Sequence, residues 1–129
     1  MTIATDYGMG WRREPPDFRD LTFDTHDVQF ILRISTPFKA ASAQGAVLPA
    51  AVDLRKWCTR VRDMGTLNAS TAFAVTGLIE YLERRAFGRQ GDFSELFLYR
   101  ATRDLLQWPG DTGADLRTTL RALKNFGLP

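Results

Sequence analysis

Ser70 is the residue whose type and position could support chemistry. It follows a turn at Gly65 and begins an apolar run that predicts a helix. A small nucleophile at such a turn-to-helix junction faces the surface, where the helix N-terminus and nearby backbone N–H groups can stabilise an anion. A serine also needs a base to activate it. Because no evident base accompanies Ser70 in this stretch, its position alone does not show that it reacts.

Histidine and cysteine, the side chains that most often carry catalysis or bind metals, occur once each. His26 lies upstream between acidic residues, and we interpret it as an ordinary polar residue. For Cys58 we favour a small buried hydrophobic role over a reactive thiol. No His, Cys and acidic residues are spaced as metal ligands, so we expect neither a metal nor another cofactor.

Several short segments, in a fixed order, resemble one enzyme family. The segments are 10–20, 48–55, 61–73, 93–99 and 111–114. All five resemble papain-like cysteine peptidases. Residues 10–20 are similar to a segment that precedes the mature domain, and 48–55 to the start of that domain. Residues 61–73 resemble the active-site segment, and 93–99 and 111–114 resemble the openings of the next two helices. The resemblance covers residues 48–129. It implies a mainly α chain, namely the helical (left) half of the papain-like α+β fold.

The resemblance also assigns the residues of the active-site segment. It places Met64 at the glutamine of the oxyanion hole, Gly65 at the glycine that follows, Ser70 at the catalytic cysteine and Thr71 at the next aromatic residue. A thioether cannot donate a hydrogen bond, and a serine hydroxyl has a far higher pKa than a thiol. The family's catalytic histidine and asparagine belong to its second, β-rich half. The resemblance therefore implies a degenerate site with no catalytic residues.

The pattern around this segment predicts about three helices. The first runs from about Ala69 to Ala86, where close packing could explain Gly77, and Gly88 ends it. The second runs from an N-cap at Ser94 to about Leu105. The third covers about 114–126, with Asp111 or Thr112 as its cap and Gly127 as a left-handed C-terminal cap. Its apolar residues share one face: Leu116, Leu120, Leu123 and Phe126.

The sequence predicts an extended N-terminal arm and linker at 1–47, followed by a helical subdomain at 48–129. The resemblance implies that the arm is similar to a propeptide. Within the arm, 28–34 is rich in β-branched and aromatic residues and predicts a short strand or an apolar extended segment. The Ala/Ser/Gly-rich stretch 39–49 predicts a flexible linker. Trp11 and Phe18 anchor the arm either on the chain's own core or on a partner.

Composition limits the function classes. The 129 residues suffice for one modest domain, and a formal charge of +2 with scattered arginines does not indicate nucleic-acid binding. No stretch approaches the roughly 20 apolar residues of a membrane span, and the start lacks the pattern of a signal peptide. A single cysteine excludes an intramolecular disulfide. We therefore expect a cytoplasmic protein.

A half-fold leaves an apolar face that another surface must cover. We therefore expect a non-catalytic papain-like pseudo-peptidase that acts as a protein-interaction or structural/regulatory subunit of a hetero- or homo-oligomeric complex. Trp11, Phe18 and Trp108 are the candidate contacts with the partner protein. The alternative is one part of a split hydrolase, in which Ser70 is the nucleophile and the partner supplies histidine and asparagine.

Overall fold

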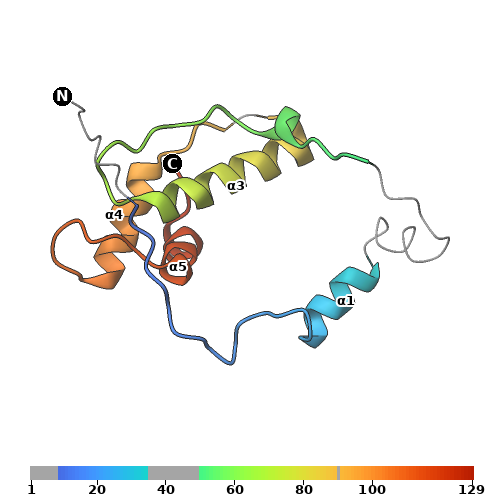
Figure 1. Ribbon diagram of the computed structural model, residues 1–129, viewed down its shortest axis with the longest axis horizontal. Helices are drawn as coiled ribbons and strands as arrows, with labels where there is room; N and C mark the ends of the chain where they lie inside the picture. Colours follow the sequence, from blue (N-terminus) through green and yellow to red (C-terminus); the bar gives the residue numbers. More distant parts are fainter. Residues whose placement is uncertain (1–8, 35–49, 90) are drawn as a thin grey trace. The chain divides into compact units, whose positions relative to one another are not determined.

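The computed structural model describes residues 9–34, 50–89 and 91–129 (Figure 1). The chain forms two compact units, one comprising Met1–Glu14 with Leu54–Pro129 and the other Pro15–Asp53. The first unit contains the short 3-10 helix η1 (Arg55–Trp57) and three helices, α3 (Ser70–Phe87), α4 (Glu95–Leu106) and α5 (Leu116–Phe126). The second contains α1 (His26–Ile34). The prediction of a mainly α chain is confirmed, and the described residues add only an isolated β-bridge between Trp11 and Ala114.

α3 is the long helix of the first unit, and its predicted bounds are correct to within a residue. It ends at Gly88, which adopts the left-handed conformation with φ +65°. The helix buries Val75, Thr76 and Glu80, whereas Leu78 and Leu82 remain about half exposed. Gly77 lies on its open side, because an added Cβ would meet no atom within 4 Å. The close packing expected there is absent among the described residues.

Side-chain caps set the starts of α4 and α5. The Ser94 hydroxyl accepts the Phe97 N–H at 3.2 Å, as predicted. At α5 the cap is Asp115, whose carboxylate accepts the Thr118 N–H at 2.6 Å. The predicted caps Asp111 and Thr112 are therefore wrong, because the helix begins later than its apolar pattern indicated. Gly127 ends α5 with φ +71° but ψ −163°, which is not the predicted left-handed helical cap.

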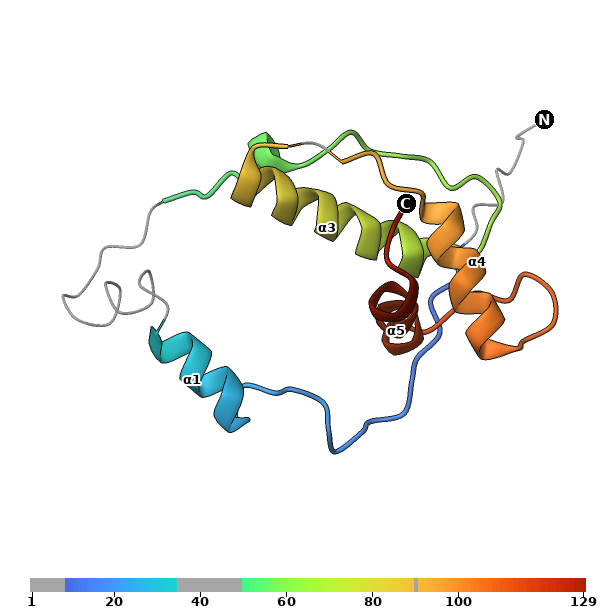
Figure 2. The ribbon, with the colours of Figure 1, turned by 180° about the vertical axis from the view of Figure 1, so that it is seen from behind.

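The three helices pack around a small core (Figures 1 and 2). Its larger members are Val75, Leu98 and Tyr99, and the remaining hydrophobic members are alanines. Buried threonines of α3, α4 and α5 fill the rest of the space between these helices: Thr71, Thr76, Thr102, Thr118 and Thr119. The Thr119 hydroxyl bonds to the Asp115 carbonyl at 2.8 Å and to the Thr71 hydroxyl at 3.1 Å. Small side chains let the helices approach closely, but they bury little apolar surface.

This packing turns α5 away from its expected orientation. The helix buries Thr118, Thr119 and Ala122, while Leu116, Leu120 and Phe126 are 39%, 46% and 55% exposed. The leucine face that the spacing identified is thus mainly on the surface. The reason is steric, because the Thr/Ala side permits a closer approach to α3 and α4 than a leucine face would.

In the second unit, the predicted strand at 28–34 is wrong, because these residues belong to α1. The Thr25 carbonyl accepts the Gln29 N–H at 3.0 Å, which closes the first helical turn. Asp27 in the first turn and Arg33 in the last both suit the helix dipole. These end signals outweigh the β-branched and aromatic composition on which the strand prediction rested. The predicted linker at 39–49 lies outside the described residues.

Candidate functional site

The turn that precedes α3 brings the predicted degenerate site together. Met64 and Gly65 lie in the turn, where Gly65 has φ +60° and donates its N–H to the Asp63 carboxylate at 2.8 Å. Ser70 and Thr71 are the first two residues of α3. Thr71 is 3% exposed and points into the core, where it contacts Thr119. The turn therefore positions a serine at a helix N-terminus, as predicted.

The Ser70 hydroxyl has no reaction partner among the residues that the structure describes. Its Oγ is shielded from solvent and forms no hydrogen bond with the described residues. A general base must lie within about 3 Å of the hydroxyl that it activates, and none does among those residues. His26, the one histidine, belongs to the second unit, where its side chain is 94% exposed and lies 3.6 Å from the Asp27 carboxylate.

Residues 9–12 of the N-terminal arm pair with the loop that leads into α5. The Ala114 N–H donates to the Gly10 carbonyl at 2.8 Å, and the Arg12 N–H donates to the Ala114 carbonyl at 2.9 Å. The Arg12 Nε also donates to the Thr112 carbonyl at 2.6 Å. These bonds form the parallel bridge between Trp11 and Ala114. The arm is thereby fixed to the helical body over this short stretch.

Two glycines allow the arm to lie directly against the turn before Ser70. A Cβ on Gly10 would lie 1.9 Å from the Asn68 carbonyl oxygen, and a Cβ on Gly113 would lie 2.0 Å from the Gly10 carbonyl oxygen. Both glycines also have positive φ, +73° and +84°. The arm backbone is thus held between the Asn68 turn and the loop at 112–114. Sequence reasoning missed this contact, because nothing local pairs residue 10 with residue 113.

A polar cluster connects the same turn to α4. The Asn68 N–H and side-chain amide both donate to Asp111, at 3.0 Å to its carboxylate and 2.8 Å to its carbonyl. Tyr99 donates its hydroxyl to the same carboxylate. Burial and this hydrogen bond raise the pKa of Tyr99 to about 12. Burial acts to raise the pKa of Asp111, but the hydrogen bonds from Tyr99 and Asn68 outweigh it and lower that pKa.

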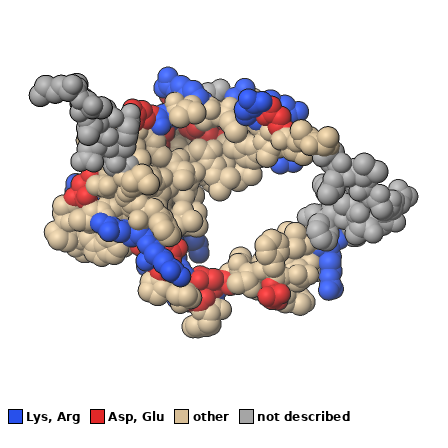
Figure 3. Space-filling view, in the orientation of Figure 1, with Lys and Arg blue, Asp and Glu red and all other residues tan. Residues whose placement is uncertain are grey.

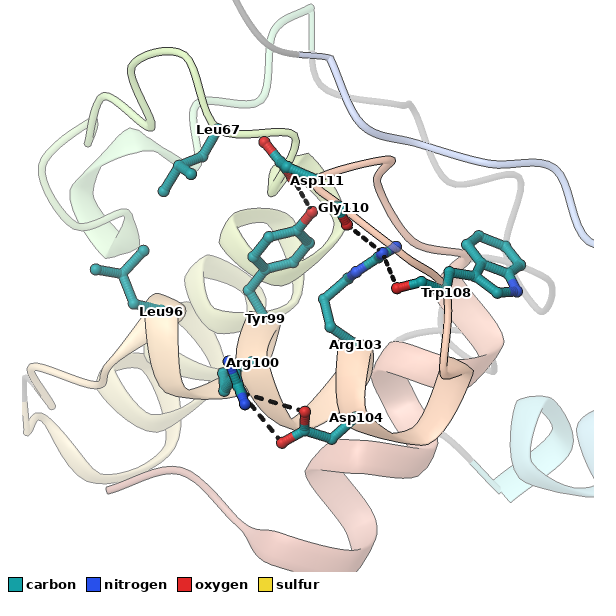
Figure 4. Close-up of a pocket in the computed structure, with 9 residues that line it drawn as sticks. All are labelled: Leu67, Leu96, Tyr99, Arg100, Arg103, Asp104, Trp108, Gly110 and Asp111. Atoms are coloured by element: carbon teal, nitrogen blue, oxygen red, sulfur yellow. Dashed lines mark hydrogen bonds and ion pairs between the residues drawn. The ribbon is translucent and has the colours of Figure 1, made fainter.

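A shallow pocket of about 410 Å³ lies beside this cluster (Figure 4). Its apolar lining includes Leu67, Leu96 and Trp108. Arg103 points toward the loop, where it donates to the Trp108 carbonyl at 2.6 Å and to the Thr112 hydroxyl at 3.0 Å. Its guanidinium also lies 5.8 Å from the Trp108 ring centroid. These contacts hold the Arg103 side chain against the loop.

A second polar network, which sequence reasoning missed, lies further along α3. Glu80 is 1% exposed, and its carboxylate accepts hydrogen bonds from Arg62 Nη2 at 2.8 Å and from the Thr59 hydroxyl at 2.7 Å. Arg62 also contacts Glu95, and it pairs with Asp92 at 2.6 Å. The sequence offered no signal for this network, because Arg62 lies in the loop before α3 and no local pattern pairs it with Glu80.

The predicted contact residues are all exposed. Trp11 is 60%, Phe18 96% and Trp108 41% exposed, so none is enclosed in the chain's own core. Phe18 packs only loosely, with the Arg19 guanidinium 5.6 Å from its ring centroid. The burial predicted for Cys58 is wrong, since that residue is exposed and its Sγ lies 3.7 Å from the Leu54 carbonyl.

Among residues 9–34, 50–89 and 91–129, no group of three or more His, Cys, Asp or Glu side chains is placed to hold a metal ion. Within the same ranges, no helix has the length and apolar character needed to cross a membrane. Comparisons of the chain with models of known protein families, with curated proteins and with solved structures found no match.

Proposed function

We propose that this chain is a non-catalytic relative of the papain-like peptidases and acts as a protein-interaction or structural subunit of a larger complex. The environment of Ser70 supports the proposal that the chain is non-catalytic. Its hydroxyl is shielded from solvent and has no hydrogen-bond partner among the described residues. The paired arm lies against Asn68, two residues earlier in the chain. A nucleophile requires the opposite arrangement, with an accessible oxygen and an adjacent base.

The exposed apolar residues of the helical body support the interaction part. Leu78 and Leu82 of α3 are 52% and 48% exposed, and Leu116 and Leu120 of α5 are similarly accessible. In Figure 3 the surface along α3 is largely uncharged, with charged side chains along its upper border. Because these leucines are already about half buried, covering one of them in a complex would contribute roughly half of the 1.5–3 kcal/mol that complete burial of an exposed leucine gives. Because the core itself is small, a partner would add substantially to the stability of this unit.

Affinity capture with matched variants tests this proposal. The tagged chain and Leu120→Asp are used to capture proteins from the native source, with Val61→Asp as the control because Val61 is 99% exposed. We expect one protein to be retained in defined stoichiometry by the wild type and by Val61→Asp, and to be lost with Leu120→Asp. Circular dichroism confirms that the variants are folded. Equal retention by all three chains, or no stoichiometric partner, contradicts the proposal.

The alternative is a split hydrolase whose partner supplies histidine and asparagine. The position of Ser70 as the first residue of α3 favours it, because the helix N-terminus favours a developing anion. Met64 opposes it, since a thioether cannot donate to an oxyanion. Peptide and ester hydrolysis by the captured complex, compared with the complex of Ser70→Ala, distinguishes the two. Hydrolysis that disappears in Ser70→Ala would establish the alternative.

A further inference from the structure

Residues 10–12 of the arm are held mainly through their backbone. The Gly10 carbonyl accepts the Ala114 N–H, the Arg12 N–H donates to the Ala114 carbonyl, and the Arg12 Nε adds a side-chain bond to the loop. Trp11, between them, is 60% exposed. Among the described residues, the hydrophobic core of this unit has no member from 9–14. The arm is therefore bound as a peptide ligand is bound by strand addition, rather than as a part of the core.

The residues on either side of the arm are held in place by bonds that do not involve it. Asn68 donates its N–H to the Asp111 carboxylate at 3.0 Å and its side-chain amide to the Asp111 carbonyl at 2.8 Å. On the other side, Arg103 donates to the Thr112 hydroxyl at 3.0 Å and to the Gly113 carbonyl. A preorganised site avoids the cost of ordering its own groups when a ligand binds. These residues are therefore suited to bind the arm reversibly.

Two contacts select the sequence of the bound segment. A Cβ at position 10 would lie 1.9 Å from the Asn68 carbonyl oxygen, and Gly10 has φ +73°, so this position requires glycine. Two residues later, the Arg12 Nε donates to the Thr112 carbonyl at 2.6 Å. The side chain of Trp11 is mainly exposed, so the position between them is not selected. The contacts therefore specify an extended Gly-Xaa-Arg segment.

We propose that Asn68 and residues 112–114 form a binding site for an extended Gly-Xaa-Arg peptide, and that the chain's own arm is the ligand that occupies it. The arm can leave this site, and the same tripeptide on another molecule can replace it. This goes beyond the function proposed above, which concerns the surface of α3 and α5. Because the tripeptide is held by two backbone bonds and one side-chain bond, a separate peptide binds weakly, with a dissociation constant on the order of 1 mM.

Nuclear magnetic resonance of the full chain tests the site, with the synthetic peptide Met-Gly-Trp-Arg-Arg-Glu, the sequence of residues 9–14, as the probe. In the Gly10→Ala chain the added Cβ displaces the tethered arm and frees the site. We expect the peptide to shift the Asn68 and Ala114 amide signals of this variant saturably. The wild type, whose own arm competes at high effective concentration, should need at least about tenfold more peptide. The Arg12→Ala chain, which loses one bond without added strain, should lie between the two.

Matched peptides test the selection on the Gly10→Ala chain. The peptide with Gly10→Ala should not bind, and the peptide with Arg12→Ala should bind about tenfold more weakly. The peptide with Arg13→Ala is the control, because Arg13 is exposed, and it should bind like the parent.

Three results would overturn the proposal. They are no saturable binding to the Gly10→Ala chain, equal binding of the Gly10→Ala peptide, and equal affinity of the wild-type chain. A Gly10→Ala chain that circular dichroism shows to be unfolded also overturns it, because the arm would then be part of the fold. The capture experiment with Leu120→Asp is independent of these results, since it concerns a different surface.

Discussion

Two positions along α3 hold buried polar groups in opposite ways. Near the middle of the helix, the Glu80 carboxylate accepts hydrogen bonds from Arg62 and Thr59. At the N-terminus, the Ser70 hydroxyl is shielded but forms no hydrogen bond with the described residues. A buried group with a complete set of partners organises structure. The Ser70 hydroxyl therefore adds no hydrogen bond among the described residues, whereas the Glu80 carboxylate joins two elements of the unit.

Mutation of the network around Glu80 should lower the free energy of unfolding most. Arg62→Ala leaves a carboxylate that is 1% exposed without its charged partner, and breaking a buried pair in this way costs about 3–5 kcal/mol. Urea unfolding at neutral pH measures the loss, with Arg60→Ala as the control because Arg60 is exposed. Similar free energies of unfolding for Arg62→Ala and Arg60→Ala would show that the network is not structural.

Detaching the arm at residues 9–12 should have the next largest effect on stability. Gly113→Ala drives a Cβ to 2.0 Å from the Gly10 carbonyl oxygen and should detach the arm, with a cost of about 1–3 kcal/mol. Gly110→Ala is the matched control, because Gly110 has a similar positive φ but no atom within 4 Å of an added Cβ. Hydrogen exchange at the Arg12 and Ala114 amides should accelerate only in Gly113→Ala. Equal acceleration in both variants would indicate backbone strain rather than loss of the contact.

The Asp111–Tyr99 pair should make stability depend on pH at both extremes. The lowered pKa of Asp111 means that its contribution is present above its unfolded pKa of about 3.9 and is lost as the pH falls through the folded value. Tyr99 has its pKa raised to about 12, so its contribution is complete below about 10 and is lost as the pH rises toward 12.

Ultraviolet titration checks the alkaline side, because phenolate absorbs where phenol does not. The difference between the wild type and Tyr99→Phe should report a group that ionises near pH 12. On the acid side, Asp111→Asn should flatten the fall in stability. A Tyr99 signal that titrates near pH 10 would show that neither the burial of Tyr99 nor its hydrogen bond to Asp111 persists in solution.

Mutation of Ser70 should change the free energy of unfolding least. Ser70→Ala removes a shielded hydroxyl that forms no hydrogen bond with the described residues, so the free energy of unfolding should change by less than about 0.5 kcal/mol or rise slightly. Thr119→Val is the contrasting variant, because the Thr119 hydroxyl bonds to both Thr71 and Asp115. A loss in Ser70→Ala as large as in Thr119→Val would mean that Ser70 has a partner in solution.

Local signals explain why two of the helices could be predicted closely. Gly88 and Ser94 are residues whose own chemistry ends or begins a helix, and α3 and α4 have nearly the predicted bounds. The predicted start of α5 was less accurate, because Asp111, Thr112 and Asp115 are all residue types that can cap a helix. Only tertiary packing selects Asp115. For α1, the composition favoured a strand, although helical spacing and charged ends were also present.

The candidate site was predictable only where it depends on one stretch of chain. Ser70 at a helix start follows from Gly65 and the apolar run after it. The arm contact joins Gly10 to Gly113, and the buried network joins Arg62 to Glu80, across gaps that no periodicity spans. Such contacts depend on how separate elements pack, so the sequence pattern could not reveal them.

We expect that Ser70 does not act as a nucleophile, and covalent labelling of the serine measures this. The purified chain is incubated with a serine-reactive fluorophosphonate, and its intact mass is measured beside that of Ser70→Ala. The enclosed hydroxyl predicts no adduct on either chain. One adduct on the wild type that is absent from Ser70→Ala would show that Ser70 is a reactive nucleophile and would contradict the proposal of a non-catalytic chain.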